Sequence, residues 1–297
     1  PVSSMKRQNM KLDKARARLL VLAETPLLLG SAIGSAVLSS GYIGLYVRPN
    51  VEYSIHSLLV QAIVSTILGS LVVGALYWVL RSGGYRTRRV IVAFVVSPIL
   101  GFVAIFVGET LLLVMFKGTM NVLHGVLLLF SIGVSLFSLV LIVVDIAPRL
   151  LRSLFVIFYG SVFGTFLGVT MLTSTVLVVM VSVVIEDYVL TRYHPQGAPE
   201  VLLGSPGKDP FEYARVQMGG SAIGAGDFVV YSLLTAHAIA YFPTYVWGMT
   251  LLLATLGVAI NSFILAREQR VLPGIPLPTL LAVFPWAVHL TVLPMLT

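Results

Sequence analysis

Two aspartates lie in or beside long apolar stretches of this chain, where a carboxylate is costly. Asp227 follows Gly224-Ala225-Gly226 in a stretch that stays apolar to about residue 240, and Asp187 lies near the end of an apolar run over 173–192. A charge at the centre of a bilayer costs at least ~2.5–3.5 kcal/mol on insertion scales, so such residues are usually functional and usually have a partner. The sequence therefore predicts that Asp187 and Asp227 form a functional pair.

A facing pair of aspartates can hydrolyse a peptide bond. Two carboxylates a few ångströms apart do not both ionise easily, so they share a proton. The ionised carboxylate activates a water molecule, while the protonated one polarises the scissile carbonyl. We expect the backbone of Gly224-Ala225-Gly226 to admit an extended substrate. We expect the proline cluster 273–278, which includes Pro276-Leu277-Pro278, to supply a second edge of the site, because prolines interrupt a helix and leave carbonyls unpaired.

The composition sets the class of protein around this pair. The chain has 297 residues, of which 58% are hydrophobic and only 10% are charged, and its mean hydropathy is +0.98. Its apolar residues come in long runs, which predicts a polytopic membrane protein. The absence of cysteine excludes disulfides, thiolate metal sites and a cysteine nucleophile. The basic residues fall in connections between spans, so the high pI is interpreted as a topology signal and no nucleic-acid partner is expected.

The apolar runs predict an all-α fold of nine transmembrane helices. A basic cytoplasmic tail (1–18) precedes five scaffold helices within 19–170, and 171–297 holds helices six to nine with the aspartate pair. The expected spans are 19–40, 55–80, 90–116, 121–146, 153–170, 173–192, 218–240, 244–266 and 279 to the end. With the N-terminus inside and the C-terminus outside, 17 of the 19 Lys and Arg residues lie on the inner side, as the positive-inside rule requires.

At this point the chain resembles the presenilin and signal-peptide-peptidase family of intramembrane aspartyl proteases, in particular the archaeal presenilin homologues. Gly224-Ala225-Gly226-Asp227 matches the family's Gly-x-Gly-Asp motif, and Phe228 and Tyr231 are similar to its following residues. Residues 152–192 resemble the fifth and sixth spans, and Pro276-Leu277-Pro278 resembles the Pro-Ala-Leu motif. The resemblance implies cleavage of transmembrane substrates in a prokaryotic, archaeal-type cell membrane, without a cofactor or metal.

Two departures from the family pattern leave alternatives open. Glu186 stands where the family has a tyrosine before the sixth-span aspartate, which makes it a candidate modulator of the pair and allows an inactive member. Pro276 occupies the alanine position of the Pro-Ala-Leu motif.

A transporter or ion pathway could also use buried carboxylates as proton or cation relays, although no inverted repeat is evident. Prepilin-type peptidases share Gly-x-Gly-Asp but resemble a shorter bundle.

Three further acidic residues lie near apolar runs and receive structural interpretations. Asp145 is the rival partner for Asp227, but its place beside Arg149 at an inner boundary predicts a solvated end or a helix-terminus residue. Glu109 is expected to be a packing or interfacial group, and Glu24 to pair with the basic tail. The five histidines form no metal-binding pair such as His-x-x-x-His. The expected partners are the bilayer and transmembrane substrates, with homo-oligomerisation left open.

Overall fold

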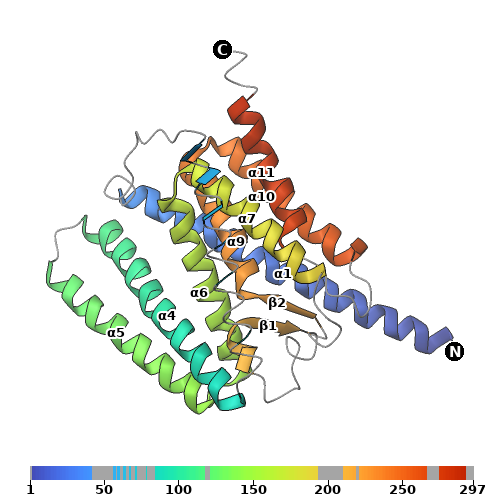
Figure 1. The fold of residues 1–297 in the computed structure, drawn as a ribbon, viewed down its shortest axis with the longest axis horizontal. Coiled ribbons are helices and arrows are strands. Elements are labelled where there is room, and N and C mark those ends of the chain that lie inside the picture. The colour runs from blue at the N-terminus through green and yellow to red at the C-terminus, as the bar shows by residue number, and fades with distance from the viewer. Residues whose placement is uncertain are drawn as a thin grey trace.

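The computed structural model of the chain describes residues 2–41, 84–117, 121–192, 210–218, 221–265 and 274–291, and isolated positions between 56 and 78. The expected second span, 55–80, therefore lies largely outside the described residues. Within them the chain is mainly helical and carries one two-stranded sheet (Figure 1).

The helices follow the apolar runs closely. The long helices are α1 (Val2–Ser40), α4 (Tyr85–Phe116), α5 (Asn121–Val144), α6 (Arg149–Thr170), α7 (Thr173–Arg192), α9 (Ala225–Tyr241), α10 (Thr244–Ile260) and α11 (Pro276–Thr291). A π-helical turn, η2 (Asn261–Leu265), extends α10. The tail and first span form one continuous helix, because α1 begins at Val2. The break expected near Leu172 is present, since α6 ends at Thr170 and α7 begins at Thr173.

The protein is a helical membrane protein. Five described helices are long and apolar enough to cross a bilayer: Leu20–Ser40, Arg86–Phe116, Val122–Val144, Arg149–Thr170 and Thr244–Ile264. A span needs about 20 predominantly apolar residues. These five correspond to the first, third, fourth, fifth and eighth spans expected from the sequence. The helix α11, over the expected ninth span, is shorter and apolar.

The stretch before Asp227 differs from the expectation. A helix was predicted from about 218, and a loop up to 216, but Arg215–Met218 (β1) and Ser221–Gly224 (β2) pair as an antiparallel hairpin, and α9 begins only at Ala225. A short 3-10 turn, η1 (Pro210–Tyr213), precedes the hairpin. The apolar residues of β2 continue the pattern of α9, so hydropathy alone did not separate strand from helix. Gly219-Gly220, between the strands, is a dipeptide typical of hairpin loops.

Helix α9 is the central helix of the described fold (Figure 1). Every residue from Val230 to Ala238 is buried, as expected for a helix that is apolar all round. The glycines of α6 lie directly against it: a Cβ on Gly164 would meet the backbone carbonyl of Val229, and one on Gly168 would come within 2.6 Å of the Leu233 carbonyl oxygen. Gly160, Gly164 and Gly168 of α6 therefore face α9 and set how close the two helices approach.

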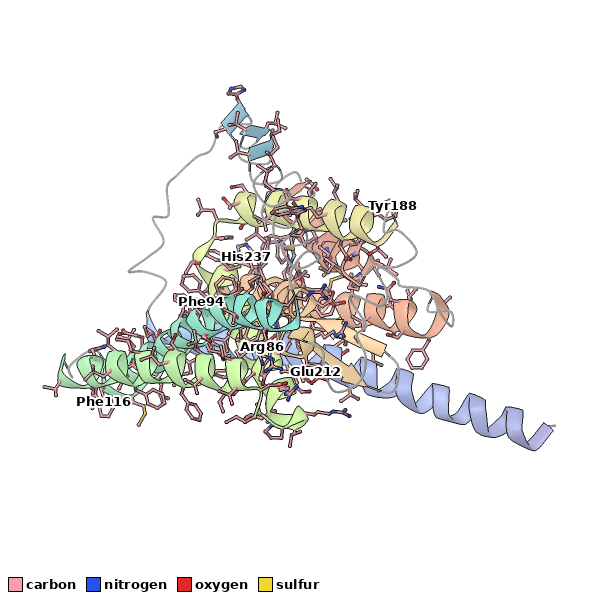
Figure 2. The ribbon with its side chains drawn as sticks, turned by 60° about the horizontal axis from the view of Figure 1, so that its bottom comes forward. Arg86, Phe94, Phe116, Tyr188, Glu212 and His237 are labelled. Atoms are coloured by element: carbon pink, nitrogen blue, oxygen red, sulfur yellow. The ribbon has the colours of Figure 1, made fainter. Side chains whose placement is uncertain are left out.

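Helix α1 packs on α9 in the same way. An added Cβ on Gly30 would collide with the backbone of Ser232, and one on Gly34 would lie only 3.1 Å from the Ala236 Cα, so this small-xxx-small pair is used for close packing. At the far end of α9, His237 lies between the helices (Figure 2). Its Nδ1 is 2.7 Å from the Gly168 carbonyl and its Nε2 is 3.0 Å from the Thr173 hydroxyl. Close backbone packing and this histidine together fix the position of α9.

We predict that Gly164→Ala destabilises the protein, whereas Gly133→Ala does not. A methyl group at Gly164 would overlap the backbone of α9, and overpacking of this kind costs about 1–3 kcal/mol. Gly133 in α5 has no described atom within 4 Å of an added Cβ, so there alanine brings only its better helix propensity of about 1 kcal/mol. Thermal unfolding midpoints in detergent measure the difference. Equal midpoints for the two variants would contradict the packing described here.

Candidate active site

Asp227 lies in the first turn of α9, at the junction between the hairpin and the helix. Gly224 is the N-cap residue, with an extended backbone (φ −77°, ψ 158°). The Gly224 N–H donates to Asp227 Oδ2 over 3.0 Å. The Ala225 N–H donates to the Ala214 carbonyl over 2.8 Å and so attaches the start of the helix to β1. The carboxylate expected about nine residues inside a span is instead at the positive end of a helix dipole.

Asp187 approaches the same point from the last turns of α7. Its Oδ2 accepts a hydrogen bond from the Ile275 N–H over 3.1 Å, and the Gly274 amide also faces it. The Cα of Gly274 lies against the other aspartate, because a Cβ there would be 2.7 Å from Asp227 Oδ1. The two carboxylates interact electrostatically. The structure therefore brings the predicted pair together around the Gly274–Ile275 backbone.

Two side chains hold this backbone in place. The Tyr231 hydroxyl donates to the Gly274 carbonyl over 3.0 Å, and the Asn261 Nδ2 donates to the same oxygen over 3.2 Å. Tyr231 is buried on α9, one turn after Asp227, and Asn261 opens the π-helical turn at the end of α10. With its carbonyl fixed from two helices, Gly274 presents its other face to the aspartates.

The Pro-Leu-Pro segment lies next to these contacts. Pro276 begins α11, and Pro278 is buried against Gly257 of α10. Residues 276–278 thus anchor the start of α11, while the polar contacts to the aspartates come from Gly274 and Ile275. Gly274 and Ile275 lie within the proline cluster 273–278 expected to form an edge of the site, but neither was named as a site residue. A signal was present, since Pro273-Gly274-Ile275-Pro276 cannot continue a helix and leaves its amides available.

Space for a ligand adjoins the pair at Gly226. Gly226 is exposed, and no described atom lies within 4 Å of a Cβ built there. Ala222 of β2 is exposed as well. In a two-stranded sheet each strand has an unpaired edge that can accept another strand. The Gly224-Ala225-Gly226 backbone therefore lies where an extended peptide could approach Asp227.

Asp145 and Glu109 form ion pairs with residues other than the two aspartates. Asp145, the rival partner, ends α5 with a positive φ of 64° and pairs with Arg89 and Arg152, each at 2.9 Å. Glu109 pairs with His124 at 3.1 Å. Glu186 precedes Asp187 on α7 and is partly buried.

Glu24 differs from its expected role. It accepts a hydrogen bond from the Thr255 hydroxyl over 3.0 Å, whereas an ion pair with the basic tail was expected. Its second oxygen, Oε1, is buried without a hydrogen-bond partner among the described residues. The α1–α10 contact therefore places a carboxylate between two spans, where its cost must be offset by packing around it.

Metal ligands do not converge in the described part of the chain: no group of three His, Asp or Glu side chains there has the arrangement that a metal ion needs. Comparison with known proteins finds no matching family model and no similar curated protein.

We predict that the two aspartates are energetically coupled. At alkaline pH, where both carboxylates are ionised, Asp187→Asn and Asp227→Asn should each raise the thermal midpoint, because each removes the repulsion between like charges. The double variant should gain less than the sum of the two, since the repulsion can be removed only once.

The matched control combines Asp187→Asn with Glu109→Gln, whose carboxylate pairs with His124 in the α4–α5 hairpin. These two changes should be additive. Additivity in the aspartate pair as well would show that the two carboxylates do not interact.

Proposed function

We propose that the chain is an intramembrane aspartyl endopeptidase that hydrolyses peptide bonds of transmembrane substrates. The observation that carries the proposal is the convergence of Asp187 and Asp227, from two different helices, on the backbone of Gly274–Ile275. A carboxylate pair of this kind needs only water as its second reactant, so no cofactor enters the reaction.

The chemistry follows from one proton shared by two carboxylates. The ionised carboxylate takes a proton from water while the water oxygen bonds to the carbonyl carbon, and the protonated carboxyl gives its proton to the carbonyl oxygen. A tetrahedral diol results. The first carboxylate then passes its proton to the amide nitrogen as the C–N bond breaks, and one hydroxyl proton of the diol returns to the second carboxylate. The pair regains its starting protonation and releases a carboxylic acid and an amine.

A substrate helix must open before this reaction, because its peptide bonds are enclosed within its own hydrogen bonds. The unpaired edge of the β1–β2 hairpin offers backbone groups that replace those bonds as the substrate becomes extended. The open space at Gly226 leaves room for the substrate backbone next to Asp227. Hairpin and carboxylates together suit an extended segment drawn from a transmembrane helix.

Nine spans with the N-terminus inside remain our proposal for the topology. The relative directions of the described helices support it, because contacts make α1, α4, α6 and α9 mutually parallel and α5 and α10 antiparallel to them. The contacts, two for each helix pair, are Gly30 with Ser232 and Gly34 with Ala236, Gly164 with Val229 and Gly168 with Leu233, Phe102 with Phe163 and Phe106 with Phe166, Gly101 with Ser135 and Glu109 with His124, and Ser31 with Trp247 and Glu24 with Thr255. Strict alternation of nine spans requires this pattern.

The central test replaces each aspartate in turn. Asp187→Asn and Asp227→Asn should each abolish cleavage of a single-span substrate in liposomes, because neither an amide–carboxylate pair nor an isolated carboxylate can perform both proton transfers. Mass spectrometry of the products measures cleavage. Glu186→Gln and Glu109→Gln are the matched controls and should keep activity.

Full activity in either asparagine variant would exclude the proposal. The competing function, transport through buried carboxylates, predicts a proton flux across the liposome membrane that both asparagine variants lose, with no cleavage products from the wild type.

A second test probes the space beside the pair. Gly226→Ala adds one methyl group where no described atom lies within 4 Å, so the thermal midpoint should not fall. The methyl would displace a substrate backbone, and kcat/KM should drop about tenfold or more, as small misplacements of a reacting group do. Gly248→Ala in α10, which is equally open, is the control. Unchanged kinetics for Gly226→Ala would remove the substrate from this position.

A further inference from the structure

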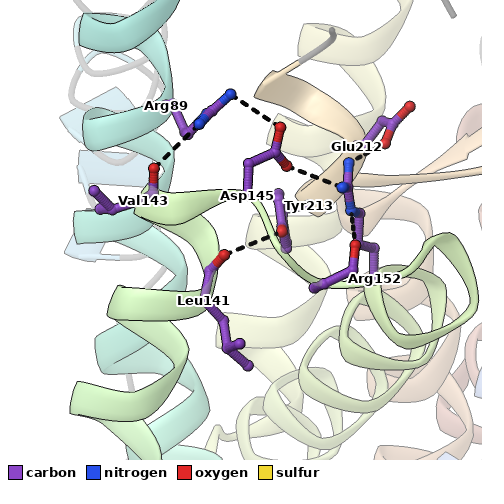
Figure 3. A network of polar contacts seen from close by, with 8 residues as sticks. Arg89, Leu141, Val143, Asp145, Arg152, Glu212 and Tyr213 are labelled. Carbon is purple, nitrogen blue, oxygen red and sulfur yellow. Dashed lines mark hydrogen bonds and ion pairs between the residues drawn. The ribbon is translucent and has the colours of Figure 1, made fainter. Parts of the chain in front are cut away.

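Four charged side chains of alternating sign form a continuous chain beside the hairpin (Figure 3). Arg89 Nη2 and Arg152 Nη2 each lie 2.9 Å from an oxygen of Asp145, and Arg152 Nη1 contacts Glu212 Oε2. None of these side chains is more than 19% exposed. The chain of charges therefore links α4, the α5–α6 corner and η1 in a largely dehydrated setting.

The scaffold side of this network is firmly fixed. Arg89 Nη1 donates to the Val143 carbonyl over 3.1 Å, and Arg152 Nε donates to the Ala147 carbonyl over 2.7 Å. Arg152 thus uses its Nε and both Nη atoms on three different acceptors, as the planar guanidinium allows. Its direction is set by α6 and the α5–α6 corner before it reaches Glu212.

On the hairpin side, Glu212 begins a short series of contacts that ends at Asp227. Tyr213 is buried, its carbonyl accepts the Tyr159 hydroxyl over 2.9 Å, and the Arg152 guanidinium lies 5.1 Å from its ring centroid. The next residue, Ala214, accepts the Ala225 N–H that starts α9. Glu212 is therefore the charged attachment point of the hairpin, three residues before β1.

The fact that this attachment is an ion pair is informative about its role. The free-energy cost of dehydrating two charges offsets much of their attraction, and well-packed apolar residues in their place often stabilise a protein as well or better. Arg152 is already held by Asp145 and the Ala147 carbonyl, and its planar guanidinium makes the contact to Glu212 directional. A directional contact at this point fixes the hairpin relative to α6, and with it the edge that lies next to the aspartates.

We propose that Arg152 and Glu212 form a clasp that positions the β1–β2 hairpin for the substrate strand, so that both are positioning residues for the peptidase proposed above, on which this inference rests. Glu212 touches no substrate in this arrangement. Its effect reaches the reaction through the placement of β1 and β2. In Figure 2 Glu212 lies near Arg86, at the end of α4 opposite Phe116, which is the inner side in our topology.

The test separates the position of the hairpin from catalysis. Because the chain has no cysteine, Leu150→Cys and Ala222→Cys, both at exposed positions, give a unique pair of spin labels on α6 and β2. In full-length protein in liposomes, Glu212→Gln should broaden the distance distribution between the labels. Glu212→Asp, which keeps the charge, should restore much of the wild-type distribution. Glu109→Gln breaks a different ion pair and should leave the distribution unchanged.

Kinetics of the unlabelled variants provide the second readout. Glu212→Gln should lower kcat/KM about tenfold, mainly through KM, because loss of one charge-assisted contact of this size weakens placement of the substrate strand. Glu212→Asp should recover part of it. The clasp would be overturned if Glu212→Gln left the distance distribution unchanged. It would also be overturned if the Gln and Asp variants lost kcat and thermal midpoint to the same extent. If the wild type cleaves no substrate, the proposed function fails, while the label distances still decide whether the clasp holds the hairpin.

Discussion

Two carboxylates in apolar surroundings need hydrogen-bond donors, and the described fold places backbone N–H groups beside both of them. Asp227 receives the Gly224 N–H and Asp187 receives the Ile275 N–H. Both amides come from interruptions between helices, where backbone groups lack partners within a helix. A membrane helix that ran unbroken through either position would have no amide to give. The breaks at 224 and 274 are therefore a condition for placing the pair at all.

Close packing by glycine makes these short contacts reproducible. Gly164 and Gly168 bring α6 against the backbone of α9, and Gly30 brings α1 against the same helix. Without a hydrophobic driving force between helices in a bilayer, association depends on such close contacts. Helix α9 carries both Asp227 and Tyr231. Any shift of α9 would therefore move the aspartate and, at the same time, the hydroxyl that binds the Gly274 carbonyl. Packing far from the pair thus sets its geometry.

The sequence predicted the parts of this arrangement that depend on hydropathy and on costly charges. Asp187 and Asp227 were identified because a carboxylate in an apolar run is costly and is usually functional, and the boundary between the expected spans 153–170 and 173–192 matches the break between α6 and α7. Asp145 was correctly separated from the pair by its place beside arginines. The hairpin was missed because Ala222 and Ile223 are apolar, and periodicity over four residues does not distinguish a strand from a helix. Gly274 lies in the proline cluster expected to form an edge of the site, but it was not named as a site residue because its role depends on contacts from α7, α9 and α10.

The hairpin changes how the Gly-x-Gly-Asp stretch is understood. Within a helix, Gly224 and Gly226 would be explained by close packing, as Gly164 is. At a strand-to-helix junction they have different tasks: Gly224 caps the helix in an extended conformation and Gly226 leaves its surroundings open. The first turn of a helix has amides without internal partners, and the strand before it has an unpaired edge. A segment that must become extended beside Asp227 would meet both sets of groups at once. The same junction that orients the carboxylate therefore also provides backbone for the substrate that we propose.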